Sequence, residues 1–284
     1  MKNIVTRSIS GIIYVGLIVG ALLAGSIWFT ALCVLFCLLA MLEFQKLTSA
    51  RSNDAIAMAI RLTDIAAAVA LCVVSHDVMT ALVYGPAMIL PIYIIVRTVL
   101  ALYDRGDDVF ASIGRSALSI LYIGVPLSMA SVTYDMSDGG HAPWLVLMMF
   151  VMIWLNDTGA YCVGSLFGRH RLCERLSPKK SWEGFWGGMA FCIIAGAVCC
   201  FINNGWSMAS DCFAINLVKW VGLGMLVSLM STWGDLFESL IKRSLGVKDS
   251  GHLIPGHGGI LDRIDSLLLV APATFVYGLL TSLF

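Results

Sequence analysis

Apolar side chains fill long stretches of this chain, and polar residues gather in the short connections between them. A helix needs roughly 20 apolar residues to cross the hydrocarbon core of a bilayer. The pattern therefore predicts about nine transmembrane helices. Their approximate ranges are 9–25, 27–44, 56–74, 78–102, 113–133, 144–166, 183–203, 214–241 and 262–283.

Composition agrees with an all-α, polytopic integral membrane protein. Of 284 residues, 59% are hydrophobic and 13% are charged, whereas soluble domains carry about a quarter charged residues. A soluble, disordered or nucleic-acid-binding protein is thereby excluded. Basic and acidic residues number 18 each, so the net charge of zero indicates neither an acidic nor a basic partner.

The basic residues predict the orientation, because they lie on alternate connections. The connections around residues 26, 76, 138 and 207 contain no Lys or Arg. By the positive-inside rule, the N-terminus is cytoplasmic. We expect a multi-pass protein of the cell (inner) membrane whose active site faces the cytoplasm. Arg61, Arg97 and Lys219 fall within apolar windows, where snorkelling or structural ion pairs are the simplest interpretation.

Unusual polar residues are concentrated in the second half of the chain. We therefore expect one membrane domain, with a transmembrane scaffold over 1–133 and a catalytic region over 134–284. The segment 239–265 is the richest: its glycines and Pro255 predict a tight turn whose free backbone N–H groups lead into a helix start. Such a turn favours a phosphate, although a Gly/Pro-rich stretch between helices is often only a turn.

Carboxylates around this segment indicate a metal site. Asp262 and Asp265 lie three residues apart on one face of a predicted helix, and Asp235 lies towards the cytoplasmic end of the preceding one. Uncompensated carboxylates beside a bilayer are costly, and Mg²⁺ bridging carboxylates and phosphates would satisfy both groups. We expect the three acids to meet near one depth. Asp157 is a further intramembrane acid, and its pairing with Arg61 or Arg97 is the structural alternative to a role in the site.

The connection before the seventh predicted helix carries a second motif, Ser177-Pro178-Lys179-Lys180-Ser181-Trp182-Glu183-Gly184. Ser181 is expected to cap the helix, with Glu183 in its first turn. Gly184, Gly187 and Gly188 permit close helix packing, within the chain rather than between two copies. A homodimer is left open.

The residues of these two motifs carry a family resemblance. The run from Ser239 to Asp265 resembles the signature of the phosphatidate cytidylyltransferases, or CDP-diglyceride synthetases, in the form S-x-x-K-R-x4-K-D-x-G-x2-I-P-x-H-G-G-x2-D-R-x-D. The Ser177–Gly184 block resembles the family's S-P-K-K-T-W-E-G, with Ser181 in place of the commoner Thr. Motif similarity covers roughly residues 150–266.

The resemblance implies an enzyme that joins CTP and phosphatidic acid in the bilayer to give CDP-diacylglycerol and pyrophosphate, using Mg²⁺. A second cation such as K⁺ is left open. The implied catalytic residues are Asp235, Lys242, Asp262 and Asp265, of which the three aspartates are also the implied metal ligands. The implied substrate-binding residues are Asp157, Lys179, Lys180, Ser239, Arg243, Lys248, Asp249, His257, Gly258, Gly259 and Arg263.

Three other functions compete with this interpretation. A CDP-alcohol phosphotransferase would carry a D-G-x2-A-R pattern, which is absent from the sequence. An ion-coupled transporter could also use broken helices with intramembrane acids, but it would need a site open to both faces. A non-catalytic relative would normally lose one of the motif acids, and none is missing.

Overall fold

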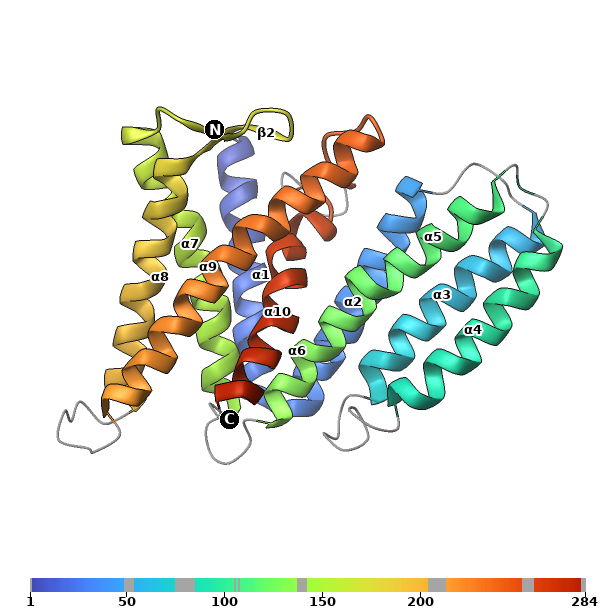
Figure 1. The fold of residues 1–284 in the computed structure, drawn as a ribbon, viewed down its shortest axis with the longest axis horizontal. Helices are drawn as coiled ribbons and strands as arrows, with labels where there is room; N and C mark the ends of the chain where they lie inside the picture. Colours follow the sequence, from blue (N-terminus) through green and yellow to red (C-terminus); the bar gives the residue numbers. More distant parts are fainter. Residues whose placement is uncertain are drawn as a thin grey trace. The chain divides into compact units, whose positions relative to one another are not determined.

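The computed structural model describes residues 2–48, 54–74, 85–104, 106, 108–136, 142–203, 213–251 and 258–281, with the backbone alone for 2–8, 142 and 203. Within them the chain is almost entirely helical, as expected for an all-α membrane protein (Figure 1). Eight described helices are long and apolar enough to cross a membrane, and Ile9–Ala24 is a shorter apolar helical segment. Large apolar side chains such as Leu102 and Leu280 are about four-fifths exposed at 78% and 80%, as expected where lipid replaces water.

The chain packs into two compact units, and each is described by itself. The first unit contains residues 1–143 together with 249–264, and the second contains 144–248 together with 265–284. The segment 239–265 that carries the longer motif is therefore divided between them. The two units are defined by which residues pack together. They therefore do not test the expected boundary between a scaffold and a catalytic region near residue 133.

The described residues of the first unit form six α-helices and one π-helical turn, besides the start of α10. Its elements are α1 (Lys2–Ala24), α2 (Ser26–Thr48), α3 (Ala55–Val74), α4 (Gly85–Tyr103), α5 (Val109–Ser119), η2 (Ile120–Gly124) and α6 (Val125–Met136). The predicted window 78–102 begins outside the described residues, and its helix is described from Gly85. The helices α2, α3 and α6 pack against one another, and the start of α10 belongs to the same unit.

The π-helical turn has a local cause. Pro126 has no backbone N–H to donate to the carbonyl of Tyr122, so the regular hydrogen-bond ladder is interrupted. The N–H of Val125 reaches the carbonyl of Ile120 instead. At the end of this turn, a Cβ on Gly124 would lie 2.9 Å from the Cβ of Ala68, so the glycine allows α3 to approach closely.

The second unit contains the remaining elements. They are α7 (Ala142–Phe167), β1 (Arg171–Cys173), β2 (Ser177–Ser181), α8 (Trp182–Asn203), α9 (Phe213–Ser244) and α10 (Leu261–Thr281), whose first turn belongs to the first unit. The strands β1 and β2 are antiparallel, and Arg171 pairs with Ser181. Hydropathy did not predict this hairpin, because it lies in a polar connection between two apolar runs.

Candidate active site

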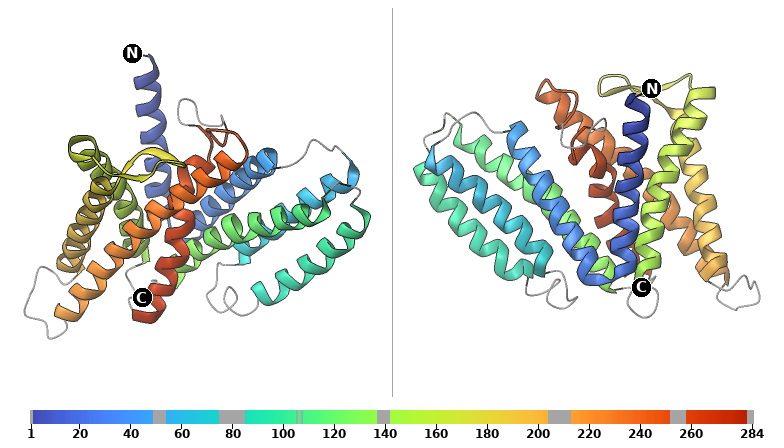
Figure 2. Two further views of the ribbon diagram at one scale, coloured as in Figure 1. Left: turned by 45° about the horizontal axis from the view of Figure 1, so that its top comes forward. Right: turned by 180° about the vertical axis from the view of Figure 1, so that it is seen from behind.

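The β1–β2 hairpin leads from the end of α7 into the start of α8 and carries the second motif (Figure 2). The Oγ of Ser181 accepts the N–H of Gly184 at 3.1 Å, which confirms the predicted N-cap. Glu183 in the first turn accepts the backbone N–H of His170 at 3.2 Å and lies 2.6 Å from Nδ1 of its ring. These bonds tie the hairpin to α8 and so fix the position of Lys180.

The glycines of α8 bring this helix against α7, which confirms that they serve internal packing. A Cβ on Gly188 would lie 2.5 Å from Oδ1 of Asn156. One on Gly187 would lie 2.5 Å from the Cβ of Val163, and one on Gly184 would lie 2.8 Å from a backbone oxygen of α7. Any larger side chain at these positions would have to push the two helices apart.

Asn156 joins α7 to α9 inside the second unit. It is only 3% exposed, and its Oδ1 accepts the hydroxyl of Ser228 at 2.7 Å. Its Nδ2 donates to the hydroxyl of Ser231 at 3.4 Å. A buried amide that both donates and accepts is satisfied, so this network fixes α7 against α9 at the residue before Asp157.

The acids of α9 and α10 meet the lysine of the hairpin in the second unit. Oδ2 of Asp235 lies 2.7 Å from Nζ of Lys180, and its Oδ1 accepts the hydroxyl of Ser239 at 3.4 Å. Asp265 interacts electrostatically with Asp235, Asp157 and Lys180. The two sequence motifs therefore contribute to one polar cluster of this unit, which we call the Asp235 cluster: Asp157, Lys180, Asp235, Ser239 and Asp265.

Close packing of α9 against α10 creates this arrangement. A Cβ on Gly234 would lie only 2.6 Å from the carbonyl oxygen of Asp265. The glycine therefore allows the backbone of α10 to approach α9 closely. One turn earlier on α9, the carbonyl of Ser231 accepts the hydroxyl of Ser266 at 3.2 Å. Asp235 and Asp265 are thereby held at the same level of two adjacent helices.

The basic residues that end α9 are not all free for a substrate. Nζ of Lys242 donates to the buried carboxylate of Glu238 one turn earlier. Nη1 of Arg243 donates to the carbonyl of Val247 at 3.2 Å, while Lys248 is exposed. Phosphate binding by Lys242 would have to compete with a buried ion pair, which costs free energy to break.

The start of α10 differs from the phosphate cradle that the sequence suggested. Oδ2 of Asp262 accepts the N–H groups of Gly259 at 2.8 Å and of Ser250 at 3.1 Å. Gly258 has a φ of 85°, and a Cβ there would lie 2.6 Å from the same carboxylate oxygen. A side chain of the protein therefore already accepts the N–H of Gly259.

The remaining predicted residues divide between the two units. Asp235, Asp265, Asp157, Ser239 and the lysines 179, 180, 242 and 248 belong to the second unit with Arg243, whereas Asp249, Gly258, Gly259, Asp262 and Arg263 belong to the first. His257 lies outside the described residues. Lys179, Asp249 and Arg263 are exposed. The expected meeting of Asp235 with Asp262 stays a prediction.

The donor chemistry of the Asp235 cluster fits a hard divalent cation. Among the residues with described positions, no three His, Cys, Asp or Glu side chains are grouped as a complete ligand set. Mg²⁺, however, is commonly held by one or two carboxylates, with water and substrate phosphates completing the shell. Asp235 and Asp265 provide such a pair, and Lys180 now supplies the positive charge beside it.

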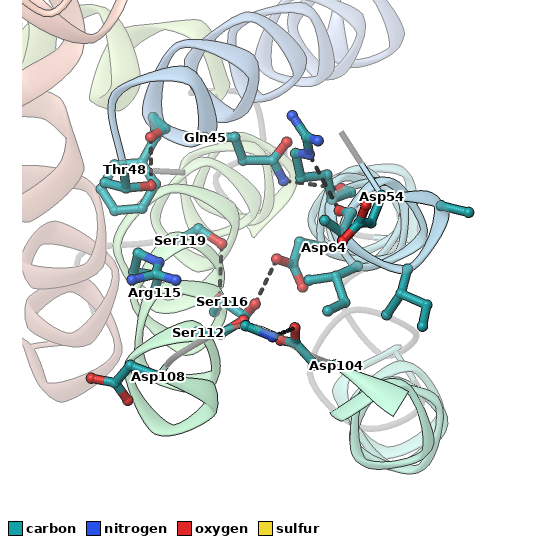
Figure 3. Close-up of a pocket in the computed structure, with 17 residues that line it drawn as sticks. Gln45, Thr48, Asp54, Asp64, Asp104, Asp108, Ser112, Arg115, Ser116 and Ser119 are labelled. Atoms are coloured by element: carbon teal, nitrogen blue, oxygen red, sulfur yellow. Dashed lines mark hydrogen bonds between the residues drawn. The ribbon is translucent and has the colours of Figure 1, made fainter. Parts of the chain in front are cut away.

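A polar pocket of about 670 Å³ lies in the first unit (Figure 3). Asp64 and Ser116 are buried on its wall, and the hydroxyl of Ser116 donates to Asp64 at 2.7 Å. Arg97 donates to Ser116 at 3.1 Å and to Ser112 at 2.9 Å. The charge near Arg97 is thus that of Asp64, and the structural pairing of Asp157 with Arg61 or Arg97 stays an untested alternative.

Two acids with structural importance were missed by the sequence interpretation. Glu238 pairs with Lys242, and Glu43 near the end of α2 accepts hydrogen bonds from the turn before α10. Both are carboxylates within apolar stretches, and an ionisable residue in such a stretch is a signal of function or pairing. The positive-inside count considered only basic residues and therefore passed over them.

Comparison with known proteins agrees with the motifs. The family model described as "Cytidylyltransferase family" matches residues 5–281. Phosphatidate cytidylyltransferase of Staphylococcus aureus strain COL is 41% identical over 157 residues, which is 55% of each chain. Its namesake in Mycobacterium bovis is 40% identical over 166 residues, 57% of this chain and 49% of the relative. The chain spans about half the length of the curated relatives it matches. Neither comparison points to a transporter.

Proposed function

Because this chain belongs to the cytidylyltransferase family, we propose that it is a phosphatidate cytidylyltransferase. The reaction joins CTP and phosphatidic acid to give CDP-diacylglycerol and pyrophosphate. An oxygen of the lipid phosphate attacks the α-phosphorus of CTP, a P–O bond forms there, and the bond to the bridging oxygen of pyrophosphate breaks. Both reactants are anionic, so positioning and neutralisation of charge dominate the barrier.

The observation that carries this proposal is the ion pair of Lys180 with Asp235 at 2.7 Å. It joins a lysine of the hairpin motif to a carboxylate of the α9 motif, and both motifs were assigned to phosphate chemistry from sequence. In the proposed reaction, Lys180 exchanges Asp235 for a phosphate oxygen of CTP. A lysine on a flexible stem is suited to such an exchange of partners.

The remaining basic residues bind the phosphates of the two substrates. Lys179, Lys248 and Arg263 are exposed, so solvent-borne phosphates can reach them. We include Arg243, Lys242, Ser239, Asp249, His257, Gly258 and Gly259 in the same site on the strength of the motif. A phosphate monoester is already largely ionised near neutral pH, so the reaction needs no strong general base.

We propose Asp235 and Asp265 as the residues that would hold a divalent cation, with Asp262 one turn earlier on α10 as a further ligand. Mg²⁺ is the expected ion, and when bound it would neutralise phosphate oxygens of CTP. Whether a second cation such as K⁺ also binds is tested in the same assay. We further propose that the protein lies in the inner membrane and that its site faces the cytoplasm, which contains CTP.

One assay tests the proposed function. Purified protein in detergent is mixed with labelled CTP, phosphatidic acid and MgCl₂, and lipid-soluble label is measured together with released pyrophosphate. We expect equal amounts of both products and none without phosphatidic acid. An ion-coupled transporter would give neither product. Replacing CTP with dCTP or ATP tests nucleotide choice, and replacing Mg²⁺ with K⁺ or Mn²⁺ tests the cation.

A further inference from the structure

Glu43 contacts the start of α10 although more than 200 residues separate them in the chain. Its Oε1 accepts the N–H of Ile260 at 3.0 Å, and its Oε2 accepts that of Leu261 at 2.9 Å. The hydroxyl of Ser250 also donates to Oε2 at 3.3 Å. All of these residues belong to the first unit. One carboxylate therefore satisfies backbone donors that the first turn of a helix leaves without partners.

Two glycines of the longer motif make room for this carboxylate. A Cβ on Gly251 would lie 2.5 Å from Oε1 of Glu43. One on Gly259 would lie 2.4 Å from Oε2 of Glu43 and closer still to the hydroxyl of Ser250. Neither glycine has a positive φ, so neither is required by backbone conformation. The lack of a side chain at both positions is explained by the carboxylate of Glu43, which lies where a Cβ would be.

Glu43 and Asp262 divide the donors of the turn between them. Asp262 accepts the N–H groups of Ser250 and Gly259, and Glu43 accepts those of the next two residues, Ile260 and Leu261. Loss of Glu43 would leave the N–H groups of Ile260 and Leu261 without this acceptor, directly beside the donor of Gly259 that Asp262 binds. The two carboxylates therefore accept consecutive donors of one turn.

We propose that Glu43 is a positioning residue of the active site, which holds the turn 258–261 so that Asp262 points in the direction needed for the cation and phosphates. This inference rests on the proposed function. Tyr14 on α1 supports the same turn of α10, since its hydroxyl donates to the carbonyl of Arg263 at 3.0 Å. The N-terminal helices thus act on the chemistry through the beginning of α10.

Glu43→Gln is the most direct test. The amide keeps one acceptor oxygen, but its nitrogen would face one of the two N–H donors. We expect hydrogen–deuterium exchange of the peptide containing Ile260 and Leu261 to become about tenfold faster in the full-length protein. Glu174→Gln, the same change at an exposed glutamate of the hairpin, is the control and should leave exchange unchanged. Unchanged exchange in Glu43→Gln overturns the proposal, whether or not the enzyme is active.

Steady-state kinetics separate positioning from a general loss of folding. In the CTP and phosphatidic acid assay, we expect Glu43→Gln to lower kcat by about 10-fold or more and to raise the Mg²⁺ concentration needed for half-maximal rate. The KM for phosphatidic acid should stay unchanged. An inactive wild type would contradict the proposed function. An active wild type with an equally active, equally Mg²⁺-dependent Glu43→Gln would contradict only the role of Glu43.

A double-mutant cycle tests the contact itself. Gly251→Ala should lower kcat, because its methyl group would collide with the carboxylate of Glu43. In a Glu43→Asp background the carboxylate is one methylene shorter, so adding Gly251→Ala should cost less than it does in the wild type. Additive losses would mean that the glycine does not serve the carboxylate, and the proposed arrangement would be wrong.

Discussion

The carboxylates of this protein have different hydrogen-bond donors around them, and these donors indicate different roles. Asp235 faces an ammonium group and a hydroxyl, whereas Asp262 accepts two backbone N–H groups. Glu238 is fully buried against Lys242. An ion pair that a substrate can replace is suited to binding, while a carboxylate fixed by backbone donors is suited to orienting a turn.

Lys180→Ala tests the exchangeable ion pair. Removing the ammonium group should raise the KM for CTP by about 10-fold or more, because a charge-assisted hydrogen bond to phosphate contributes roughly 1.5–3 kcal/mol. The KM for each substrate is measured in the CTP and phosphatidic acid assay. Arg175→Ala removes an equal charge from an exposed position of the same hairpin and should change neither constant. An unaltered KM for CTP in Lys180→Ala would mean that this lysine only serves orientation in the membrane.

Asp262→Asn tests the carboxylate at the start of α10. The amide can still accept one backbone N–H, so the protein should insert and fold with a loss of about 1 kcal/mol in unfolding free energy. Activity should fall by roughly 100-fold, as expected for loss of a metal-directed carboxylate. Turnover and the thermal unfolding midpoint are measured on the same preparation. Near-normal turnover in a folded variant would remove Asp262 from the proposed cation site.

Glycines allow the helices of the second unit to pack closely. The glycines 184, 187 and 188 of α8 face α7, and Gly234 of α9 faces α10. Close approach of backbones is the usual basis of helix association where lipid surrounds the protein. Because Asn156 bridges α7 and α9, spacing between helices is coupled directly to the polar residues of the Asp235 cluster.

Gly188→Ala should therefore destabilise the second unit. The added methyl group would lie 2.5 Å from Oδ1 of Asn156, and overpacking of this kind costs about 1–3 kcal/mol. The matched control is Gly20→Ala on α1, where nothing lies within 4 Å of the added atom. Thermal unfolding in detergent compares the two variants. Equal midpoints would show that α7 and α8 can separate at little cost.

At the scale of the whole molecule, the membrane-spanning helices determine on which side of the membrane the polar hairpin lies. In the second unit, β2 and α9 meet through the ion pair of Lys180 with Asp235. Ile202, near the end of α8, is separated from the hairpin by the length of this one membrane-spanning helix. The proposed orientation therefore requires the hairpin and residue 202 to face opposite sides of the membrane.

Single-cysteine labelling tests this orientation. Arg175→Cys and Leu245→Cys replace exposed residues of the hairpin and of the segment after α9, in a background in which all nine native cysteines have been substituted. A membrane-impermeant maleimide should label both only after the cells are opened. Ile202→Cys should be labelled in intact spheroplasts. The reverse pattern would place the site outside and exclude access to cytoplasmic CTP.

The sequence by itself determined the helices and the family. Long apolar runs must become helices in a bilayer, since every backbone N–H and C=O has to be satisfied within the segment. The residues of the two motifs also carried the resemblance, and the match over 5–281 agrees with it. The N-cap by Ser181 was predictable because capping involves neighbours three residues apart.

Only the tertiary structure decided which partners the polar residues have. Glu43 and Ile260 are 217 positions apart, and Lys180 and Asp235 lie on different elements. No local period encodes such pairs, because they depend on how helices pack. For the same reason the sequence suggested free N–H groups at the start of α10, whereas carboxylates from within the protein accept them.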